Sequence, residues 1–216
     1  MVAIIAIPQS TLFRVGRSTG PLEFPPVAFT GDSRFDDFPD TRSFRVLYVG
    51  DRRACFFECL EDFLPDEHAT TGPPHGITAD WFRRRRIASC RVDDPLGTMQ
   101  WLDLFAPETL RDFRTRFRHD VRACHLSTLD ASVAMSEHRL ATQSIGRWAY
   151  SEGFHGIKYR TRHDITRECW AIFDRTQIRV VDPGAMIRHS DPDLQIVVQQ
   201  WNMPMPPPHL LPIACR

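Results

Sequence analysis

The sequence predicts a single α+β domain, in which helices flank a central mixed or antiparallel β-sheet. Three observations favour this class: many short apolar runs of strand length, only two or three stretches with helical periodicity, and no repeat or linker within 216 residues. Such a pattern argues against a doubly wound parallel sheet. We therefore expect one domain over 1–216, with a core from about 11 to 182 and a C-terminal extension over 183–216.

Apolar, β-prone runs between turn residues predict the strands. They lie at 1–7, 11–15, 44–49, 87–92, 100–105, 156–162, 169–173, 178–182 and 194–198. The short turn between 169–173 and 178–182 predicts a hairpin. The prolines from Pro204 to Pro208 predict an extended, loosely packed tail.

Three segments are expected to form helices. From Ala54 the apolar residues up to Leu64 fall on one arc, which leaves Glu58 on the opposite face beside Glu61 and Asp62. That position alone favours a solvated glutamate. A second helix starts with Pro107 in its first turn. A third is expected from Ser136, as its N-terminal cap, to Glu152.

Composition limits the function classes. Lys+Arg and Asp+Glu are both 27, so no net field draws the chain to nucleic acid or to a membrane surface. Apolar residues make up 42%, yet no run reaches the ~18 residues of a membrane span. Residues 1–7 predict a strand rather than a signal peptide, because they lack a basic leader. We expect a cytoplasmic protein.

Nearly all basic residues are arginines, and Lys158 is the only lysine. Arginine holds planar oxyanions in a bidentate manner, so candidate phosphate ligands are plentiful. The four consecutive arginines at 83–86 are consistent with a nucleic-acid patch or with a solvated charge run before a strand. Zero net charge favours the solvated run.

The six cysteines show no Cys-x-x-Cys spacing, which favours reduced, buried thiols. Cys55 and Cys59 could share a helix face with nearby His68 as a metal site. No second ligand pair accompanies them, so we expect no metal.

The common catalytic signatures are absent, including glycine-rich phosphate loops and Gly-x-Ser-x-Gly. A dispersed set of polar residues remains: Arg14, Arg34, Tyr48, Glu58, Tyr159, Thr161 and Arg162. Taken singly, each has an ordinary structural explanation, such as a surface arginine, a core tyrosine or a strand-end threonine.

The order of these residues resembles the RES-domain family, named for an arginine, a glutamate and a serine. The matching pieces are Leu-Phe-Arg14-Val, Ser-Arg34-Phe-Asp, Val-Leu-Tyr48, Ala54-x-x-x-Glu58, Gly-Phe-x-Gly156-Ile-x-Tyr-x-Thr161-Arg and Ala171-Ile-Phe. The likeness runs from about residue 11 to 182. Thr161 stands where the family has serine; it keeps the hydroxyl and adds a methyl group that stiffens the side chain.

The resemblance implies a fold like that of the ADP-ribosyltransferase toxins, with NAD as substrate and no cofactor. Members of the family hydrolyse or phosphorolyse NAD, so inorganic phosphate is a candidate co-substrate. On this resemblance Glu58, Arg14 and Thr161 are catalytic. The NAD-binding residues would be Arg14, Arg34, Tyr48, Tyr159, Thr161 and Arg162.

These residue types suit that chemistry. Nicotinamide leaves NAD as a neutral base, so one carboxylate suffices where an ordinary glycosidase needs two. Glu58 would stabilise an oxocarbenium-like transition state or orient the acceptor. Arg14 and Arg34 would hold the pyrophosphate, and Tyr48 would pack on a substrate ring. Thr161 would hydrogen-bond the nicotinamide ribose.

The resemblance also implies a partner. Toxins of this family pair with antitoxins that carry a helix-turn-helix-type DNA-binding domain and block the NAD pocket. The sequence leaves the oligomeric state open, with a homodimer as one candidate. Two alternatives remain within the family: ADP-ribosylation of a protein, or a domain that binds NAD or a partner without turnover. A nucleic-acid-binding protein that uses the arginines is the third reading.

Overall fold

The computed structural model describes residues 1–65, 75–136 and 138–215. The chain forms two compact units built from interleaved segments. The first unit comprises residues 1–10, 23–49 and 91–179, and the second comprises 11–22, 50–90 and 180–216. The predicted division of the chain into a core and a C-terminal extension stays a prediction.

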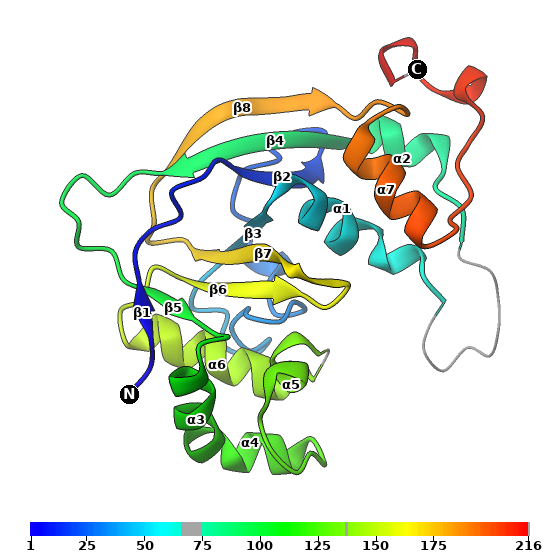
Figure 1. Ribbon diagram of the computed structural model, residues 1–216. Coiled ribbons are helices and arrows are strands. Elements are labelled where there is room, and N and C mark those ends of the chain that lie inside the picture. Colours follow the sequence, from blue (N-terminus) through cyan, green and yellow to red (C-terminus); the bar gives the residue numbers. More distant parts are fainter. Residues whose placement is uncertain (66–74, 137, 216) are drawn as a thin grey trace. The chain divides into compact units, whose positions relative to one another are not determined.

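The first unit contains five strands in the spatial order β1–β5–β6–β7–β3 (Figure 1). Their bounds are Ile4–Ile5 for β1, Val46–Gly50 for β3, Trp101–Asp103 for β5, Gly156–Thr161 for β6 and Asp164–Phe173 for β7. The pair β5–β6 is parallel, while β1–β5 and β6–β7 are antiparallel. The sheet is therefore mixed, and the predicted α+β class is confirmed.

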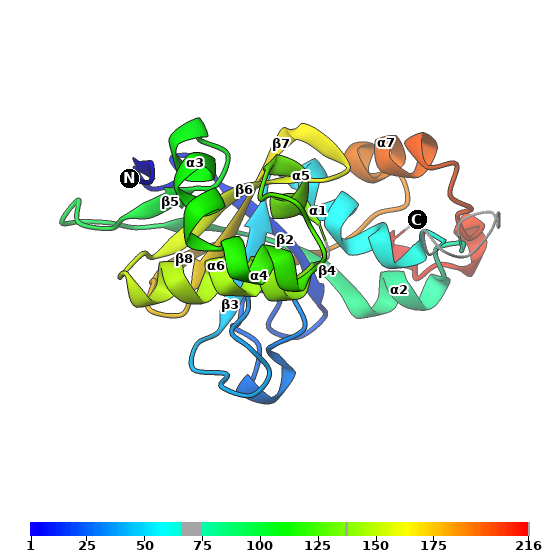
Figure 2. The same cartoon turned by 90° about the horizontal axis from the view of Figure 1, so that it is seen from below.

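Helices of the first unit gather beside β5 and β6, as Figures 1 and 2 show. They are α3 (Pro107–Arg116), α4 (Arg118–Ala123), α5 (Ala131–Met135) and α6 (Arg139–Ser151). The first unit also contains the 3₁₀ turn η1 (Val27–Phe29). Helix α6 packs on β6, α4 and α5. Its buried face includes Ala141, Ile145 and Ala149, at the spacing that one helix face requires.

The second unit is built on strands in the order β2–β4–β8. Their bounds are Leu12–Arg17 for β2, Arg85–Val92 for β4 and Ile178–Met186 for β8. Strands β2 and β4 are antiparallel from the pair Leu12–Cys90 to the pair Arg17–Arg85. The helical elements are α1 (Arg52–Leu60), η2 (Glu61–Phe63), α2 (Ala79–Arg84), α7 (Pro192–Gln200), η3 (Pro208–Leu210) and η4 (Ile213–Cys215).

The core of the second unit joins α1 to α7, which lie side by side in Figure 1. Phe56 and Phe57 of α1 share one cluster of buried residues with Leu194 of α7. The tail belongs to the same cluster, since Met203, Leu211 and Cys215 are buried in it. The backbone is tied as well: Ile77 N donates to Pro204 O at 2.9 Å, and His189 N donates to Cys215 O at 2.7 Å. The expectation of a loosely packed tail is therefore wrong.

Three further expectations are corrected. Residues 194–198 lie in helix α7, because Asp191 caps it and Pro192 occupies its first turn. The predicted hairpin between 169–173 and 178–182 does not form, because β7 lies between β6 and β3 whereas β8 neighbours β4. The N-terminal cap position of α6 is His138 rather than Ser136. Ser136 instead follows α5, where its hydroxyl donates to Val133 O at 2.7 Å.

Gly146 of α6 provides a test of the packing in the first unit. A Cβ atom at this position would lie 2.3 Å from the carbonyl oxygen of Phe35. In an open helix Gly→Ala stabilises by about 1 kcal/mol. Here we expect Gly146→Ala to lower the free energy of unfolding by roughly 1–3 kcal/mol, because the backbone at Phe35 must move. Thermal unfolding followed by circular dichroism measures this, and a gain in stability would show that the contact yields easily.

Candidate functional site

The seven predicted site residues fall into two sets. Arg14 and Glu58 belong to the second unit. Arg34, Tyr48, Tyr159, Thr161 and Arg162 belong to the first.

Helix α1 carries Glu58 in the second unit. Its N-terminus is capped by Asp51, whose Oδ1 accepts a hydrogen bond from Ala54 N at 2.9 Å. The neighbouring Cys55 is buried, and its thiol donates to Phe13 O at 2.8 Å. This contact fixes α1 on β2, and the next residue of that strand is Arg14. The local sequence thus places both family residues of the second unit on two elements packed together.

Electrostatics within this unit links Glu58 and Arg14 to the same thiol. Burial raises the pKa of Cys55, the charges of Asp51 and Glu58 raise it further, and the charge of Arg14 lowers it. One carboxylate oxygen of Glu58 (Oε1) and one guanidinium nitrogen of Arg14 (Nη1) are shielded from solvent. Glu58 is therefore not the fully solvated glutamate that helical periodicity favours. Charged groups withdrawn from water interact strongly with a polar ligand.

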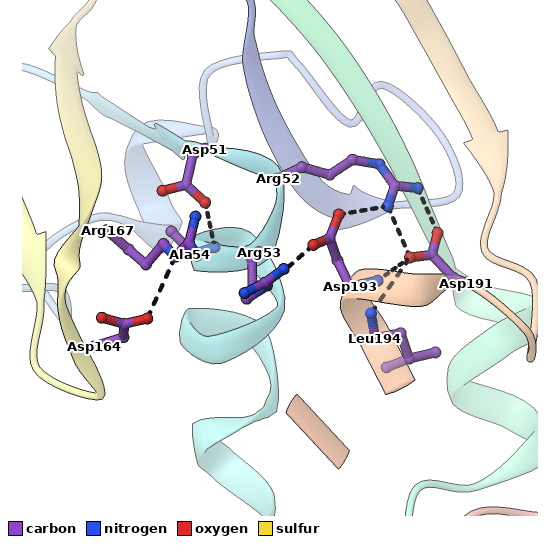
Figure 3. Close-up of polar contacts among 9 residues, drawn as sticks. All are labelled: Asp51, Arg52, Arg53, Ala54, Asp164, Arg167, Asp191, Asp193 and Leu194. Carbon is purple, nitrogen blue, oxygen red and sulfur yellow. Dashed lines mark hydrogen bonds and ion pairs between the residues drawn. The ribbon is translucent and has the colours of Figure 1, made fainter. Parts of the chain in front are cut away.

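An ion-pair network fixes the first turn of α1 to the first turn of α7 (Figure 3). Arg52 binds Asp191 through both of its terminal nitrogens, with Nη1 at 2.7 Å from Oδ1. Asp193 accepts from Arg52 Nη1 at 3.2 Å and from Arg53 Nε at 3.1 Å. Asp191 also caps α7 by accepting from Leu194 N at 3.3 Å. The hydrogen bond to Asp191 is the main cause that raises the pKa of Arg52. The network therefore orients the helix that carries Glu58.

All six cysteines lie within the described residues and none is in a disulfide; Cys55, Cys90, Cys169 and Cys215 are buried, whereas Cys59 and Cys124 are half-buried. Burial raises the pKa of Cys59 and of Cys90 to about 11 each, so both stay protonated near neutral pH. The alternative metal site includes His68, which lies outside the described residues. Among 1–65, 75–136 and 138–215, no group of three His, Cys, Asp or Glu side chains is placed to hold a metal ion.

Arg34 is buried in the first unit, with 7% of its surface exposed. Its guanidinium carbon lies 5.2 Å from the centre of the Tyr159 ring, a cation–π contact. Phe35 meets the same ring edge-on at 5.1 Å between centroids. The Tyr159 side chain is 1% exposed, so Arg34 and Phe35 both pack on a buried ring. The structure thus brings Arg34 and Tyr159 together.

Tyr48 joins this group through its hydroxyl. The hydroxyl accepts from Phe35 N at 2.9 Å and donates to Asp36 Oδ1 at 3.1 Å. Burial, followed by the nearby charge of Asp36, raises the pKa of Tyr48 well above its usual value. The phenol therefore stays protonated and acts as a donor to the carboxylate. The predicted contact of its ring with substrate stays a prediction.

Thr161 and Arg162 lie where β6 turns into β7. Thr161 is fully buried, and its Oγ1 accepts from His163 N at 3.4 Å. Arg162 Nε donates to His163 Nε2 at 3.3 Å. The turn ends at Asp164, whose carboxylate accepts from Arg167 Nε at 3.3 Å (Figure 3). The threonine hydroxyl is thus engaged in closing the turn, and its predicted role toward substrate is not tested by this geometry.

Two residues at this site were not predicted from the sequence. Asp36 and Gln143 are each 4% exposed and both hydrogen-bond the loop that carries Arg34. Asp36 is the last residue of the Ser-Arg34-Phe-Asp piece, so the motif itself contained a signal. Gln143 lies 109 positions after Arg34, and no local pattern connects them.

A small cavity of about 100 Å³ lies at the C-terminal end of β5 in the first unit. Its lining residues are Asp103, Phe105, Ala106, Lys158, Tyr159 and Arg160. Arg160 stacks on Phe105 there, with its guanidinium carbon 5.5 Å from the ring centre. Lys158 forms an ion pair with Glu168.

Of the arginines at 83–86, Arg83 and Arg84 are exposed at the end of α2, whereas Arg85 and Arg86 begin β4 and are half-buried. Arg84 is 77% exposed and pairs with Asp80 along α2, and Arg86 donates to the carbonyl of Arg83. On α3, Arg116 pairs with Asp112 in the same i,i+4 manner. No described helix combines the length and hydropathy of a membrane span.

Comparison with known proteins gives a family and a structure. The profile of the family described as RES domain matches residues 11–198 of this chain. Among solved structures, the crystal structure of the M. tuberculosis MbcT–MbcA toxin–antitoxin complex is similar over 83% of this chain and 88% of that chain. The sequence identity is 15% and the TM-score is 0.45. The comparison with curated proteins gives no match.

The Arg52–Asp191 contact predicts a loss of stability on substitution. Asp191→Asn removes the charge that Arg52 binds, while the side chain keeps its shape. We expect the free energy of unfolding to fall by roughly 1.5–3 kcal/mol, as for other charge-assisted hydrogen bonds. Urea titration measures this change.

The matched control is Asp80→Asn, because the Asp80–Arg84 pair is exposed on both sides. Such surface pairs contribute less than about 1 kcal/mol. Equal losses in the two variants would contradict a special role for the contact between α1 and α7.

Proposed function

Because the chain belongs to the RES domain family, we propose that it consumes NAD by cleaving the bond between nicotinamide and ribose. The family match carries this proposal. It spans residues 11–198 and so includes every residue of the predicted site, from Arg14 to Arg162.

The chemistry needs few groups. The nicotinamide nitrogen is cationic in NAD, and nicotinamide leaves as a neutral base without a proton. The ribose develops positive charge in an oxocarbenium-like transition state, which a nearby carboxylate stabilises. We assign this role to Glu58, whose Oε1 is shielded from solvent. The attraction between a carboxylate shielded from solvent and a positive charge is stronger than the same attraction in bulk water.

Arginines supply the binding groups for the pyrophosphate in this proposal. Arg34 supports the assignment because it is buried and its guanidinium carbon lies over the Tyr159 ring, 5.2 Å from the ring centre. An arginine in that environment is matched to an oxyanion, and its position costs little further ordering on binding. We propose Arg14, which lies on β2, as the second arginine that binds the pyrophosphate.

The acceptor is water or inorganic phosphate, which would make the chain a glycohydrolase or a phosphorylase. We propose that it is the toxin of a toxin–antitoxin pair, whose antitoxin carries a DNA-binding domain. We propose a cytoplasmic setting, in which disulfides are rare; none of the six cysteines is in a disulfide here.

A second candidate function is suggested by Thr161. The family has serine at this position, and the threonine hydroxyl here accepts from the His163 amide while the side chain is fully buried. A domain altered in this way could bind NAD or a partner, or transfer ADP-ribose to a protein, without efficient hydrolysis. Thr161→Ser distinguishes these cases: cleavage that appears only in this variant would favour the binding function.

We expect purified protein to release nicotinamide from NAD and Glu58→Gln to lower kcat on the order of 10²- to 10³-fold, as loss of a transition-state contact does. Arg14→Ala is expected to raise KM by removing a binding cation. The rate is followed by chromatography of nicotinamide.

Glu61→Gln is the matched control, because it changes a second glutamate directly after the same helix. We expect wild-type rates from it. A similar loss of rate in Glu58→Gln and Glu61→Gln would refute the assignment of Glu58. So would a wild-type protein that releases no nicotinamide.

A further inference from the structure

The loop that carries Arg34 is held by hydrogen bonds from three directions. On the N–H side, Asp36 Oδ2 accepts from Gly31 N at 2.9 Å and from Ser33 N at 3.1 Å. These bonds form a compact turn over residues 31–36. The Asp36 carboxylate is buried, and the low dielectric constant of its surroundings strengthens both hydrogen bonds.

The carbonyl side of the same turn is held by α6. Gln143 Nε2 donates to Gly31 O at 2.7 Å and to Ser33 O at 3.2 Å. Gly31 and Ser33 are therefore fixed through both their amide and their carbonyl groups. Gly146, one turn further along α6, touches the backbone of Phe35. The helix thus acts as a rigid base for the loop.

Tyr48 of β3 completes the arrangement. Its hydroxyl donates to the free side of the Asp36 carboxylate, at Oδ1, and accepts from the Phe35 amide. One hydroxyl therefore orients the carboxylate and the residue that follows Arg34. Because the pKa of the Tyr48 phenol is raised, its hydroxyl stays protonated at neutral pH and remains a hydrogen-bond donor.

We propose that Asp36, Tyr48 and Gln143 are positioning residues for Arg34, and we call these three residues the Arg34 clamp. The inference rests on the proposed function for the identity of the ligand, which is a dinucleotide pyrophosphate. Arg34 contacts the ligand, while the clamp holds its backbone so that the guanidinium stays over Tyr159 in the absence of ligand. Tyr48 acts through its hydroxyl, and its ring need not touch the substrate.

A fixed arginine binds an oxyanion more tightly than a mobile one, because less side-chain and loop freedom is lost on binding. Removing one member of the clamp should therefore weaken binding of the pyrophosphate group. It should leave the chemical step unchanged, because Glu58 belongs to a different element. A merely stabilising role would lower the melting temperature without this selective effect.

Tyr48→Phe tests the inference directly, because it removes only the hydroxyl and keeps the ring. The ligand for the measurement is ADP-ribose, which carries the pyrophosphate and has no nicotinamide bond to cleave. We expect Kd for ADP-ribose to rise on the order of tenfold in Tyr48→Phe, the equivalent of one good hydrogen bond. Gln143→Met should produce a similar rise. Calorimetry at a temperature well below unfolding measures both.

The matched control is Tyr150→Phe. Tyr150 is another tyrosine of the first unit, and its ring stacks on Phe44 at 4.3 Å. We expect it to bind ADP-ribose like wild type. Hydrogen exchange supplies a readout that does not depend on any ligand: the Phe35 amide should exchange faster in Tyr48→Phe and at the wild-type rate in Tyr150→Phe.

The outcomes separate the two proposals. Unchanged Phe35 exchange in Tyr48→Phe would overturn the clamp, and so would faster exchange with an unchanged Kd. Wild-type protein that fails to bind ADP-ribose would also overturn it. Wild-type protein that binds ADP-ribose but releases no nicotinamide from NAD would overturn only the proposed function, and the Kd comparison would still decide the role of the clamp.

Discussion

Three charged side chains are buried within four consecutive positions of the first unit, and their need for partners shapes the loop around them. Arg34 is 7% exposed, Asp36 is 4% exposed and Asp37 is fully buried. Burying a charge without partners is strongly unfavourable. Each carboxylate therefore collects donors from the loop itself. Asp37 accepts from Ser43 N at 2.6 Å and from Ser43 Oγ at 2.7 Å, and these bonds outweigh the burial that would raise its pKa, so the pKa is lowered.

The same use of carboxylates recurs at the helix termini. Asp51, Asp130 and Asp191 cap α1, α5 and α7 by accepting from backbone amides of the first turn. Asp191 has a second role, because it also binds Arg52 of α1. In the second unit one residue thus ends a loop, starts a helix and orients the helix that carries Glu58. Polar groups with two structural tasks leave few alternative arrangements for the chain.

Much of the fold was predictable because its signals are local. The strand runs near 12–17, 46–50 and 156–161 and the helices α1 and α3 follow from periodicity, caps and prolines. Residues 194–198 were misassigned as a strand because Ile196, Val197 and Val198 are β-branched and periodicity over five residues is ambiguous. Asp191-Pro192 was the signal that could have identified α7. The partner of β8 was not predictable, since pairing with β4 joins segments about 90 residues apart.

The candidate site likewise combines residues that local motifs predict with residues that only the fold brings together. The family resemblance predicts Arg34, Tyr48 and Glu58 as site residues by position, but residue types alone could not show that the Tyr48 hydroxyl donates to Asp36. Gln143 illustrates the limit most clearly. It is an ordinary helical glutamine in the sequence, and only the fold places its amide against Gly31 and Ser33. Contacts of such long sequence separation depend on the packing of α6, which local patterns do not specify.

The identity of the broken bond is the most direct test of this account. Purified protein would be incubated with NAD in ¹⁸O-labelled water, with and without inorganic phosphate, and the products identified by mass spectrometry. The account predicts nicotinamide together with either ADP-ribose that carries one ¹⁸O or a phosphorylated ADP-ribose. Intact NAD, or cleavage at the pyrophosphate to give AMP, would contradict it.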